Sequence, residues 1–291
     1  MKTKDYLNKI IQGDCLETMK SFDDESVDLV VTSPPYDGLR NYNGYSFDFE
    51  GIVKELFRVT KQGGVVVWVI GDATIEGSET GTSFKQALYF KEVGFNLHDT
   101  MIFNKRNPIP QIYRKRYNNQ FEYMFVFSKG VVKTHNPIMV DCLHAGLQLN
   151  GTTYKNYSKN VQERGKMAKP VKSQKIKGNI WEYVVGKNKE DQEAKGHPAP
   201  FPCELAQDHI LSWSNEGDVV LDPMCGSGTT CKMAKRLGRH YIGLDVSAEY
   251  CKIAEERLKM ENNLNLWTAK DLNKSDELKQ PIFLGNSKKI V

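Results

Sequence analysis

Two kinds of apolar pattern alternate along the first 130 residues and again after residue 197. Short continuous apolar runs predict buried strands, which we expect over 27–32, 65–70, 98–103, 121–127, 218–221 and 240–244. Apolar residues at helical spacing predict helices over 49–60, 83–93, 229–237 and 248–260. Strands that alternate with helices are typical of a mainly parallel α/β sheet.

This alternation breaks down from about residue 130 to residue 196, where apolar residues become sparse. Between Gly151 and Gly178 the sequence contains a single acidic residue, Glu163. The same stretch contains eight basic residues: Lys155, Lys159, Arg164, Lys166, Lys169, Lys172, Lys175 and Lys177. Tyr154, Tyr157 and Trp181 interleave with these charges. The stretch fits either a solvated insertion or a surface that neutralises phosphates. We expect four parts: 1–130, a basic insertion over 131–196, 197–267, and a polar tail over 268–291.

Composition narrows the class of protein. With 291 residues, 40% of them hydrophobic and 26% charged, the chain is typical of globular proteins that bury a sizeable core. No apolar stretch reaches the roughly 20 residues that span a bilayer, and the first residues do not form a signal peptide. Six scattered cysteines without a C-x-x-C pair disfavour a disulfide framework and a zinc site. We therefore expect a cytoplasmic protein without a metal.

A glycine-rich loop lies between the strand that ends near residue 221 and the next helix. It comprises Asp222, Pro223, Met224, Cys225, Gly226, Ser227 and Gly228. Glycines allow a ligand to approach the backbone, and the helix that begins with Thr229 and Thr230 offers N–H groups and hydroxyls to an anionic group. Asp245, followed by Val246, ends the next strand, where a carboxylate can accept both hydroxyls of a ribose.

The identity of the ligand follows from what this loop lacks. Cys231 occupies the third glycine position of the dinucleotide fingerprint, and the lysine of a phosphate-binding loop is missing, which disfavours NAD and ATP. A ligand with a ribose and a carboxylate but no phosphate fits better. S-adenosyl-L-methionine is such a ligand.

A second loop follows the first predicted strand and consists of Ser33, Pro34, Pro35 and Tyr36. By itself it predicts a proline-stiffened turn at a strand end. Together with the glycine-rich loop, however, it resembles the amino-methylating DNA methyltransferases, and specifically their beta subgroup, in which the catalytic loop precedes the cofactor loop.

Three further segments match this family in the expected order. Residues 13–16, with Asp14 and Cys15, resemble the acidic turn near the cofactor adenine. Residues 121–123 fall where the family has a short motif that lines the target-base pocket. His197, Pro198 and Phe201 resemble the segment that helps to enclose the methionine part of the cofactor.

The resemblance implies a Rossmann-like S-adenosylmethionine-dependent methyltransferase fold. We expect a seven-stranded, mostly parallel, circularly permuted sheet with an antiparallel strand near 121–127 and an inserted target-recognition region. Both loops would lie at the carboxyl ends of adjacent strands. S-adenosyl-L-methionine would be the methyl donor and S-adenosyl-L-homocysteine the product.

The resemblance also assigns chemistry to the proline loop. The Ser33 side chain and the Pro34 carbonyl would accept the two hydrogens of a base amine, and Pro35 would help to hold them in place. Tyr36 would stack on a base flipped out of the duplex. Ser33 at this position resembles cytosine-N4 enzymes, whereas Asp or Asn resembles adenine-N6 enzymes. Because either side chain accepts a hydrogen bond from either amine, adenine stays open as the alternative target.

The resemblance also implies that the basic residues bind double-stranded DNA. The predicted contacts are Lys105, Arg106, Arg114, Lys115, Arg116, Lys155, Lys159, Arg164, Lys166, Lys169 and Lys172. A cognate restriction endonuclease would be a separate chain, and monomer and homodimer both stay open. Two rival functions are an RNA or protein-amide methyltransferase and a DNA-binding relative without catalysis. The motif order and the basic insertion favour DNA, and the intact loops favour catalysis.

Overall fold

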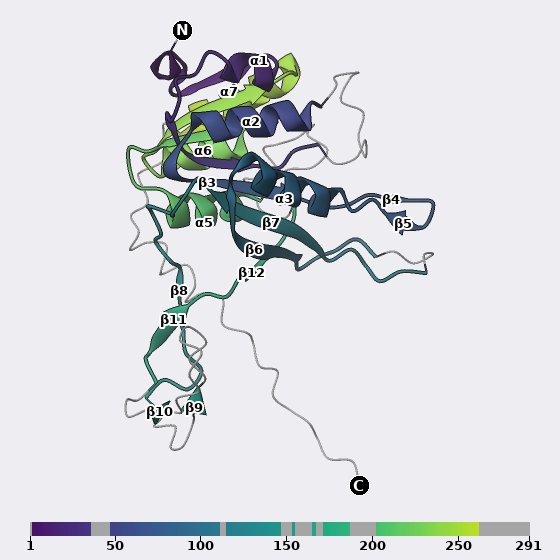
Figure 1. Ribbon diagram of the computed structural model, residues 1–291, viewed down its shortest axis with the longest axis vertical. Helices are drawn as coiled ribbons and strands as arrows, with labels where there is room; N and C mark the ends of the chain where they lie inside the picture. The colour runs from purple at the N-terminus through teal and green to yellow at the C-terminus, as the bar shows by residue number, and fades with distance from the viewer. Residues whose placement is uncertain are drawn as a thin grey trace.

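A computed structural model describes residues 2–35, 47–110, 115–146, 153–154, 165–166, 171–186 and 202–261. Its centre is an eight-stranded sheet of order β1-β14-β13-β2-β3-β7-β6-β12 (Figure 1). These strands are β1 Lys9–Gln12, β2 Val27–Thr32, β3 Thr60–Ile70, β6 Asn96–Lys105, β7 Phe121–Ser128, β12 Ile180–Tyr183, β13 Val219–Asp222 and β14 His240–Asp245. The helices are η1 Thr3–Tyr6, α1 Cys15–Met19, α2 Phe49–Val59, α3 Thr82–Val93, α5 Cys203–Trp213, α6 Thr229–Arg236 and α7 Ala248–Met260.

The direction of the strands agrees with the predicted permuted, mostly parallel sheet. Every neighbouring pair from β1 to β3 is parallel. The strand predicted to be antiparallel, β7, runs antiparallel to both β3 and β6. β13 and β14, which come late in the chain, lie between β1 and β2, and this order confirms the permutation.

The predicted number of seven strands is wrong, because β12 adds an eighth strand parallel to β6. Trp181 and Tyr183 on this strand are buried, whereas Ile180 and Glu182 are exposed. Two buried residues within a polar stretch give too short an alternation to be distinguished from a loop. The central sheet therefore extends into the range 131–196, which the sequence analysis assigned to the insertion.

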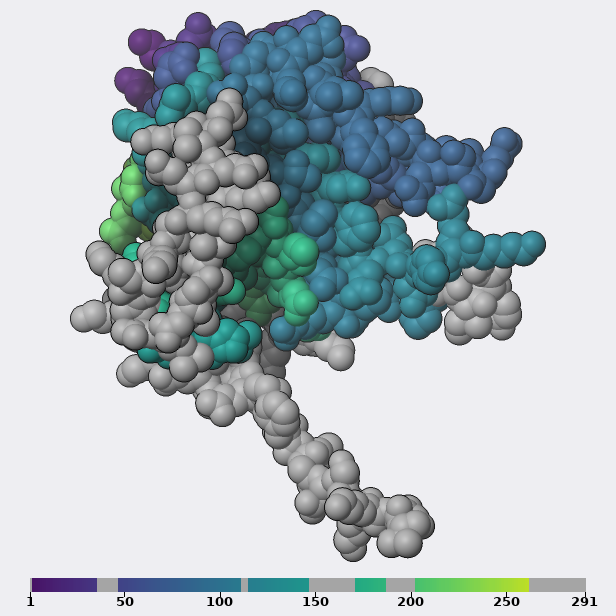
Figure 2. All heavy atoms as spheres, turned by 60° about the horizontal axis from the view of Figure 1, so that its bottom comes forward, coloured from purple at the N-terminus to yellow at the C-terminus, as the bar shows by residue number. Residues whose placement is uncertain are grey.

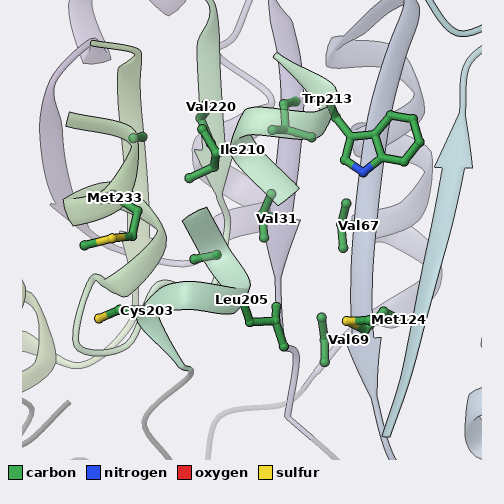
Figure 3. Close-up of a cluster of buried hydrophobic side chains, with 14 of the residues drawn as sticks. Val31, Val67, Val69, Met124, Cys203, Leu205, Ile210, Trp213, Val220 and Met233 are labelled. Carbon is green, nitrogen blue, oxygen red and sulfur yellow. The ribbon is translucent and has the colours of Figure 1, made fainter. Parts of the chain in front are cut away.

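Helices cover both faces of the sheet (Figure 1). In the cluster shown in Figure 3, Leu205, Ile210 and Trp213 of α5 lie against β2 and β3. On the opposite face, α2 and α3 join a second cluster with Val30 and Trp68. A strand covered on both faces has no polar side, and this explains why β2 and β3 appear in the sequence as continuous apolar runs.

The remaining strands form short two-stranded pairs. β4 Thr74–Ile75 and β5 Ser78–Glu79 form a hairpin, β8 Met139–Asp141 pairs with β11 Gln174–Ile176, and β9 Thr153–Tyr154 pairs with β10 Gly165–Lys166. The β8–β11 pair leads away from the central sheet (Figure 1). In the described ranges, no helix has the length and apolarity that a bilayer crossing requires.

Candidate functional site

The two predicted loops meet at the carboxyl edge of the sheet. β2 and β13 are parallel neighbours, with Val30 opposite Leu221. The segments that follow Thr32 and Asp222 therefore leave the sheet side by side, as predicted. Open α/β sheets bind their ligands at this edge.

Buried hydrogen bonds join the end of β2, which leads into the proline loop, to Asp222 and to α6. Thr32 Oγ1 donates to Asp222 Oδ1 at 2.8 Å, and Thr230 Oγ1 donates to the Val31 carbonyl at 3.2 Å. The backbone N–H of Met224 also donates to Asp222 Oδ1. Burial raises the pKa of Asp222 to about 6, although the hydroxyl of Thr32 opposes this shift. Asp222 therefore fixes the start of one loop to the end of the strand that carries the other.

The proline loop begins directly after this junction. Pro34 is buried, and Ser33 and Pro35 are half-buried. The two prolines restrict φ, so the backbone here is held largely by covalent geometry. Tyr36 lies outside the described residues.

The glycine-rich loop requires glycine for conformation and for space. Gly226 and Gly228 have φ values of 50° and 77°. A Cβ on Gly228 would lie 2.6 Å from the Cβ of Ala254 in α7. The loop therefore lies directly against α7, and any side chain at Gly228 would separate them.

Asp245 supports this loop from the neighbouring strand. Its Oδ2 accepts a hydrogen bond from the Gly226 N–H, and its Oδ1 accepts one from the Ser247 N–H, both at 2.8 Å. Each carboxylate oxygen has a second lone pair, and the side chain is only partly buried. Burial raises the pKa of Asp245. Val246 follows it and is half-buried.

Arg257, which the sequence analysis missed, forms the floor of the loop. Its Nη1 donates to the Ser227 carbonyl at 2.6 Å, to Ser227 Oγ at 3.1 Å and to Thr229 Oγ1 at 3.0 Å. The guanidinium is buried, with a relative exposure of 2%. The sequence contained one indication of this role. Arg257 lies beside the apolar positions Ala254 and Leu258 of α7, on the face that a helix normally turns to the core.

The threonine hydroxyls, predicted to be offered to an anionic group, form hydrogen bonds within the protein. Thr229 and Thr230 are buried and bind protein atoms through their side chains. Pro223 and Cys225 are also buried. A Cβ on Gly243 would lie 3.1 Å from Cys225 Sγ, which shows that this thiol fills space against β14. Among residues 222–228 only Met224 is half-buried, and the others are buried.

The acidic turn adjoins Asp245. β1 pairs with β14, with Gln12 opposite Asp245, and the Gly13 N–H donates to the Asp245 carbonyl at 2.9 Å. Asp14 is exposed and caps α1 by accepting a hydrogen bond from the Glu17 N–H. Cys15 is buried, and burial raises the pKa of its thiol to about 12. Asp14, Asp245 and the glycine-rich loop thus occupy one continuous edge.

The predicted base-pocket motif begins β7, which lies two strands from β2, the strand that leads into the proline loop. Tyr123 pairs with Ile70 at the end of β3. Its ring centroid lies 5.4 Å from those of Phe84 and Phe121. The segment with His197, Pro198 and Phe201 lies outside the described residues.

Several residues that were predicted to contact DNA form ion pairs within the protein. Lys105 pairs with Glu122 at 2.6 Å, Arg106 pairs with Glu182 at 3.1 Å, and Arg116 pairs with Glu79 at 3.3 Å. Lys115 is exposed, and Lys172 is exposed as well. Outside the described side chains lie Arg114, Lys155, Lys159, Arg164, Lys166 and Lys169. DNA binding by these basic residues stays a prediction.

Trp181, which interleaves with the basic residues in the sequence, does not lie on the surface. Its side chain is buried, and its indole N–H donates to the Gly178 carbonyl at 2.8 Å. Lys177 lies over its ring at 4.8 Å and pairs with Asp208 of α5 at 3.5 Å. The aromatic and basic residues alternate here because this edge strand of the sheet packs against a helix.

The donor set of the site fits a nucleoside without phosphates. Asp14 and Asp245 offer carboxylate oxygens to ribose or base donors, and residues 222–230 contain no lysine or arginine. The nearby cations are Lys232 and Arg257, which are 1% and 2% exposed. Lys232 pairs with the buried Glu261 at 3.3 Å. The edge therefore favours hydroxyl and amino groups over phosphate.

Comparison with known proteins gives concordant results. A family model described as DNA methylase (N6_N4_Mtase) matches residues 27–256. The orphan methyltransferase M.BamHII of Bacillus amyloliquefaciens is 55% identical over 240 residues, covering 81% of this chain and 90% of that protein.

Solved structures share the fold. TTHA0409 of Thermus thermophilus, complexed with S-adenosyl-L-methionine, has a TM-score of 0.58 and 26% identity, covering 88% of this chain and 96% of the other. The PvuII DNA methyltransferase, described as cytosine-N4-specific, has a TM-score of 0.64 and 21% identity, covering 92% of this chain and 89% of the other.

Proposed function

The chain belongs to the DNA methylase family whose model spans residues 27–256, and from this premise we propose that it methylates the N4 amine of cytosine in double-stranded DNA. Its cofactor is S-adenosyl-L-methionine, which supplies an activated methyl group. The observation that carries the proposal is the 2.8 Å hydrogen bond between Thr32 and Asp222. It holds the proline loop beside the loop that fits the nucleoside part of this cofactor.

The cofactor would be held by the carboxyl edge of β13 and β14. Asp245 would accept the ribose hydroxyls with its remaining lone pairs while it supports Gly226. The Asp14 turn would face the adenine. Cys225, Ser227, Thr229 and Thr230 would contribute through the backbone conformation that their buried side chains stabilise. Pro223 and Val246 flank this surface, and His197, Pro198 and Phe201 would enclose the methionine part.

The proline loop would activate the target amine. The lone pair of this amine is delocalised into the ring, which makes the nitrogen a poor nucleophile. The Ser33 side chain and the Pro34 carbonyl would accept its two hydrogens and so localise the lone pair toward the methyl group. Because prolines restrict the backbone, these acceptors need little reorganisation during the reaction.

The state of the cysteines supports direct transfer without a covalent enzyme intermediate. A nucleophilic cysteine acts as an accessible thiolate with a lowered pKa. Cys15 and Cys225 are both buried. Burial raises the pKa of Cys15 to about 12, and a hydrogen bond with Cys231 together with burial raises the pKa of Cys225. Both thiols therefore stay protonated at neutral pH.

DNA would present the target as a flipped base. Extrusion of a base costs a few kcal/mol, of which stacking on Tyr36 would return about 1–3 kcal/mol. The range 131–196 would form the target-recognition region between the catalytic and cofactor halves of the enzyme. We expect binding to weaken steeply with salt, and a flat salt dependence would contradict the role of the basic residues.

The choice of cytosine rests on Ser33, and adenine N6 is the alternative. The test is to incubate the protein with labelled S-adenosyl-L-methionine and unmethylated genomic DNA, and to identify the methylated nucleoside by mass spectrometry. N4-methylcytosine is expected, and Ser33→Ala should abolish most of it. N6-methyladenine would overturn the proposed base, whereas methylation of RNA or protein alone would overturn DNA as the substrate.

A further inference from the structure

Between β6 and β7 the structure describes residues 106–110 and 115–120, and these two segments together are called the arm. Its base lies at the catalytic edge of the sheet, because Tyr123 pairs with Ile70 at the end of β3 and Trp68 pairs with Thr32 at the end of β2. The arm and the β4–β5 hairpin project on the same side of the molecule (Figure 1). Figure 2 shows both as protrusions beyond the main body.

The base of the arm is fixed on two sides. The Lys105 N–H donates to the Gln120 carbonyl at 2.7 Å, which joins the two ends of the arm. The side chain of Asn107 accepts a hydrogen bond from the Val185 N–H at 2.8 Å and donates to the Val185 carbonyl at 2.9 Å. These bonds attach the arm to the chain that follows β12.

A brace fixes the arm further out. The Arg116 guanidinium donates to the Gly77 carbonyl and pairs with Glu79 at 3.3 Å. Gly77 lies in the turn of the β4–β5 hairpin, where Glu76 and Gly77 both have positive φ, as a tight two-residue turn requires. Arg116 thus links the arm to the β4–β5 hairpin.

The braced segment presents an aromatic ring to solvent. Tyr117, next to Arg116, is 99% exposed. Lys115 is exposed on the other side of Arg116. At the base of the arm, Phe121 is 45% exposed and contacts Tyr123 edge to face. Aromatic rings beside cations suit nucleic acid, because rings stack on bases while cations bind phosphates.

We propose that Tyr117 stacks against the DNA bases beside the flipped target, while Lys115 binds a neighbouring phosphate. This inference rests on the proposed function, because it takes duplex DNA as the substrate. DNA is favoured over a second copy of the chain by charge: the chain has a net charge of +4, so a cationic arm is attracted to DNA and repelled by another copy. The braced arm holds Tyr117 ready to fill the gap that an extruded base leaves.

The test compares two duplexes that contain the site methylated by the wild-type protein. In one, the target base is paired normally. In the other, it lies opposite an abasic position, so extrusion costs less. Tyr117→Ala should lower kcat/KM on the paired duplex by roughly 10- to 100-fold, the size expected for one stacked base. Most of this loss should disappear on the abasic duplex, and Tyr117→Trp should retain activity on both.

The matched control is Ile109→Ala, which removes another highly exposed apolar side chain, 85% exposed, from the same arm. It should leave both rates unchanged. Equal rates for Tyr117→Ala and wild type on the paired duplex would overturn the inference, and so would an equal loss on both duplexes. A lower sedimentation coefficient for Tyr117→Ala would assign the arm to self-association instead. If the wild-type protein methylates no DNA, the proposed function itself fails.

Discussion

The glycine-rich loop and the projecting arm lie at the same edge of the sheet but are built in opposite ways. The side chain of Ser227 in the loop and that of Thr229 at the start of α6 point inward to the buried Arg257. In the arm, Tyr117 points into solvent and the brace through Arg116 is partly exposed. The loop therefore turns side chains toward the protein, whereas the arm turns side chains toward solvent.

This difference separates two ways of making a surface rigid. A buried polar group that loses its partner costs about 1–3 kcal/mol, so the loop is held by bonds that are expensive to break. An exposed ion pair contributes roughly 0–1 kcal/mol, so beyond its hydrogen-bonded base the arm is held less firmly than the loop. The loop suits one small ligand of fixed shape, and the arm suits a large partner that adds contacts of its own.

The largest effect should come from removing the floor of the loop. Arg257→Met leaves the Ser227 carbonyl and two buried hydroxyls without their donor. We expect a loss of roughly 2–4 kcal/mol in the free energy of unfolding, together with weaker S-adenosyl-L-methionine binding. Thermal unfolding and titration calorimetry measure the two effects. Lys252→Met, at an exposed position of the same helix, should change neither. Normal stability and affinity in Arg257→Met would show that the loop needs no such floor.

An intermediate effect should appear as a pH dependence. The folded-state pKa of Asp222 is raised by burial to about 6, so the native state favours the protonated form. Stability from this group is fully present below about pH 4 and is lost as the pH rises through about 6. Asp222→Asn should therefore gain on the order of 1–3 kcal/mol relative to wild type between pH 4 and pH 7.

Urea unfolding at several pH values measures this difference. Glu76→Gln, in the exposed hairpin, is the matched control and should follow the wild-type curve. A wild-type protein that becomes more stable relative to Asp222→Asn as the pH rises would show that the hydrogen bonds from Thr32 and Met224 outweigh burial.

The smallest effect on stability should come from the brace. Arg116→Ala and Glu79→Ala should each change the free energy of unfolding by less than about 1 kcal/mol, because the pair is partly exposed. The KM for DNA should rise about two- to tenfold, because the arm loses its preorganisation. The double variant should be no worse than Arg116→Ala if the two residues act together. Additive increases in KM would show that each residue contacts DNA separately.

The sequence predicted best where one physical cause dominates. Continuous apolar runs located β2 and β3 because both faces of these strands are covered. The interrupted patterns of β1 and α1 gave no comparable signal, since β1 has no fully buried residue. Helix α5, which carries seven buried residues, was missed because Ser212 and His209 interrupt its apolar pattern.

For the site, the glycine-rich loop and the acid that ends the next strand could be located from the sequence because they follow consecutive strands. Gly226, Gly228 and Asp245 lie together as their spacing indicated. Side-chain partners were less accessible, because the contact between Arg257 and Thr229 joins residues 28 apart. Composition was misleading at Trp181, since an aromatic beside lysines is compatible with a buried edge strand as well as with a DNA surface.

The order of strands in the sheet also has a consequence for synthesis on the ribosome. β1 and β2 are made first, but they are not neighbours, because β14 and β13 lie between them. At about 5–20 residues per second, β14 emerges roughly 10–50 seconds after β1. During this interval one edge of β2 can pair with β3, but β13 is not yet available for the other edge. β1 has no neighbouring strand with which to pair. The growing chain thus carries an open, apolar sheet edge until its last strand arrives, and a nascent chain stalled before residue 245 is a substrate for chaperones rather than a smaller enzyme.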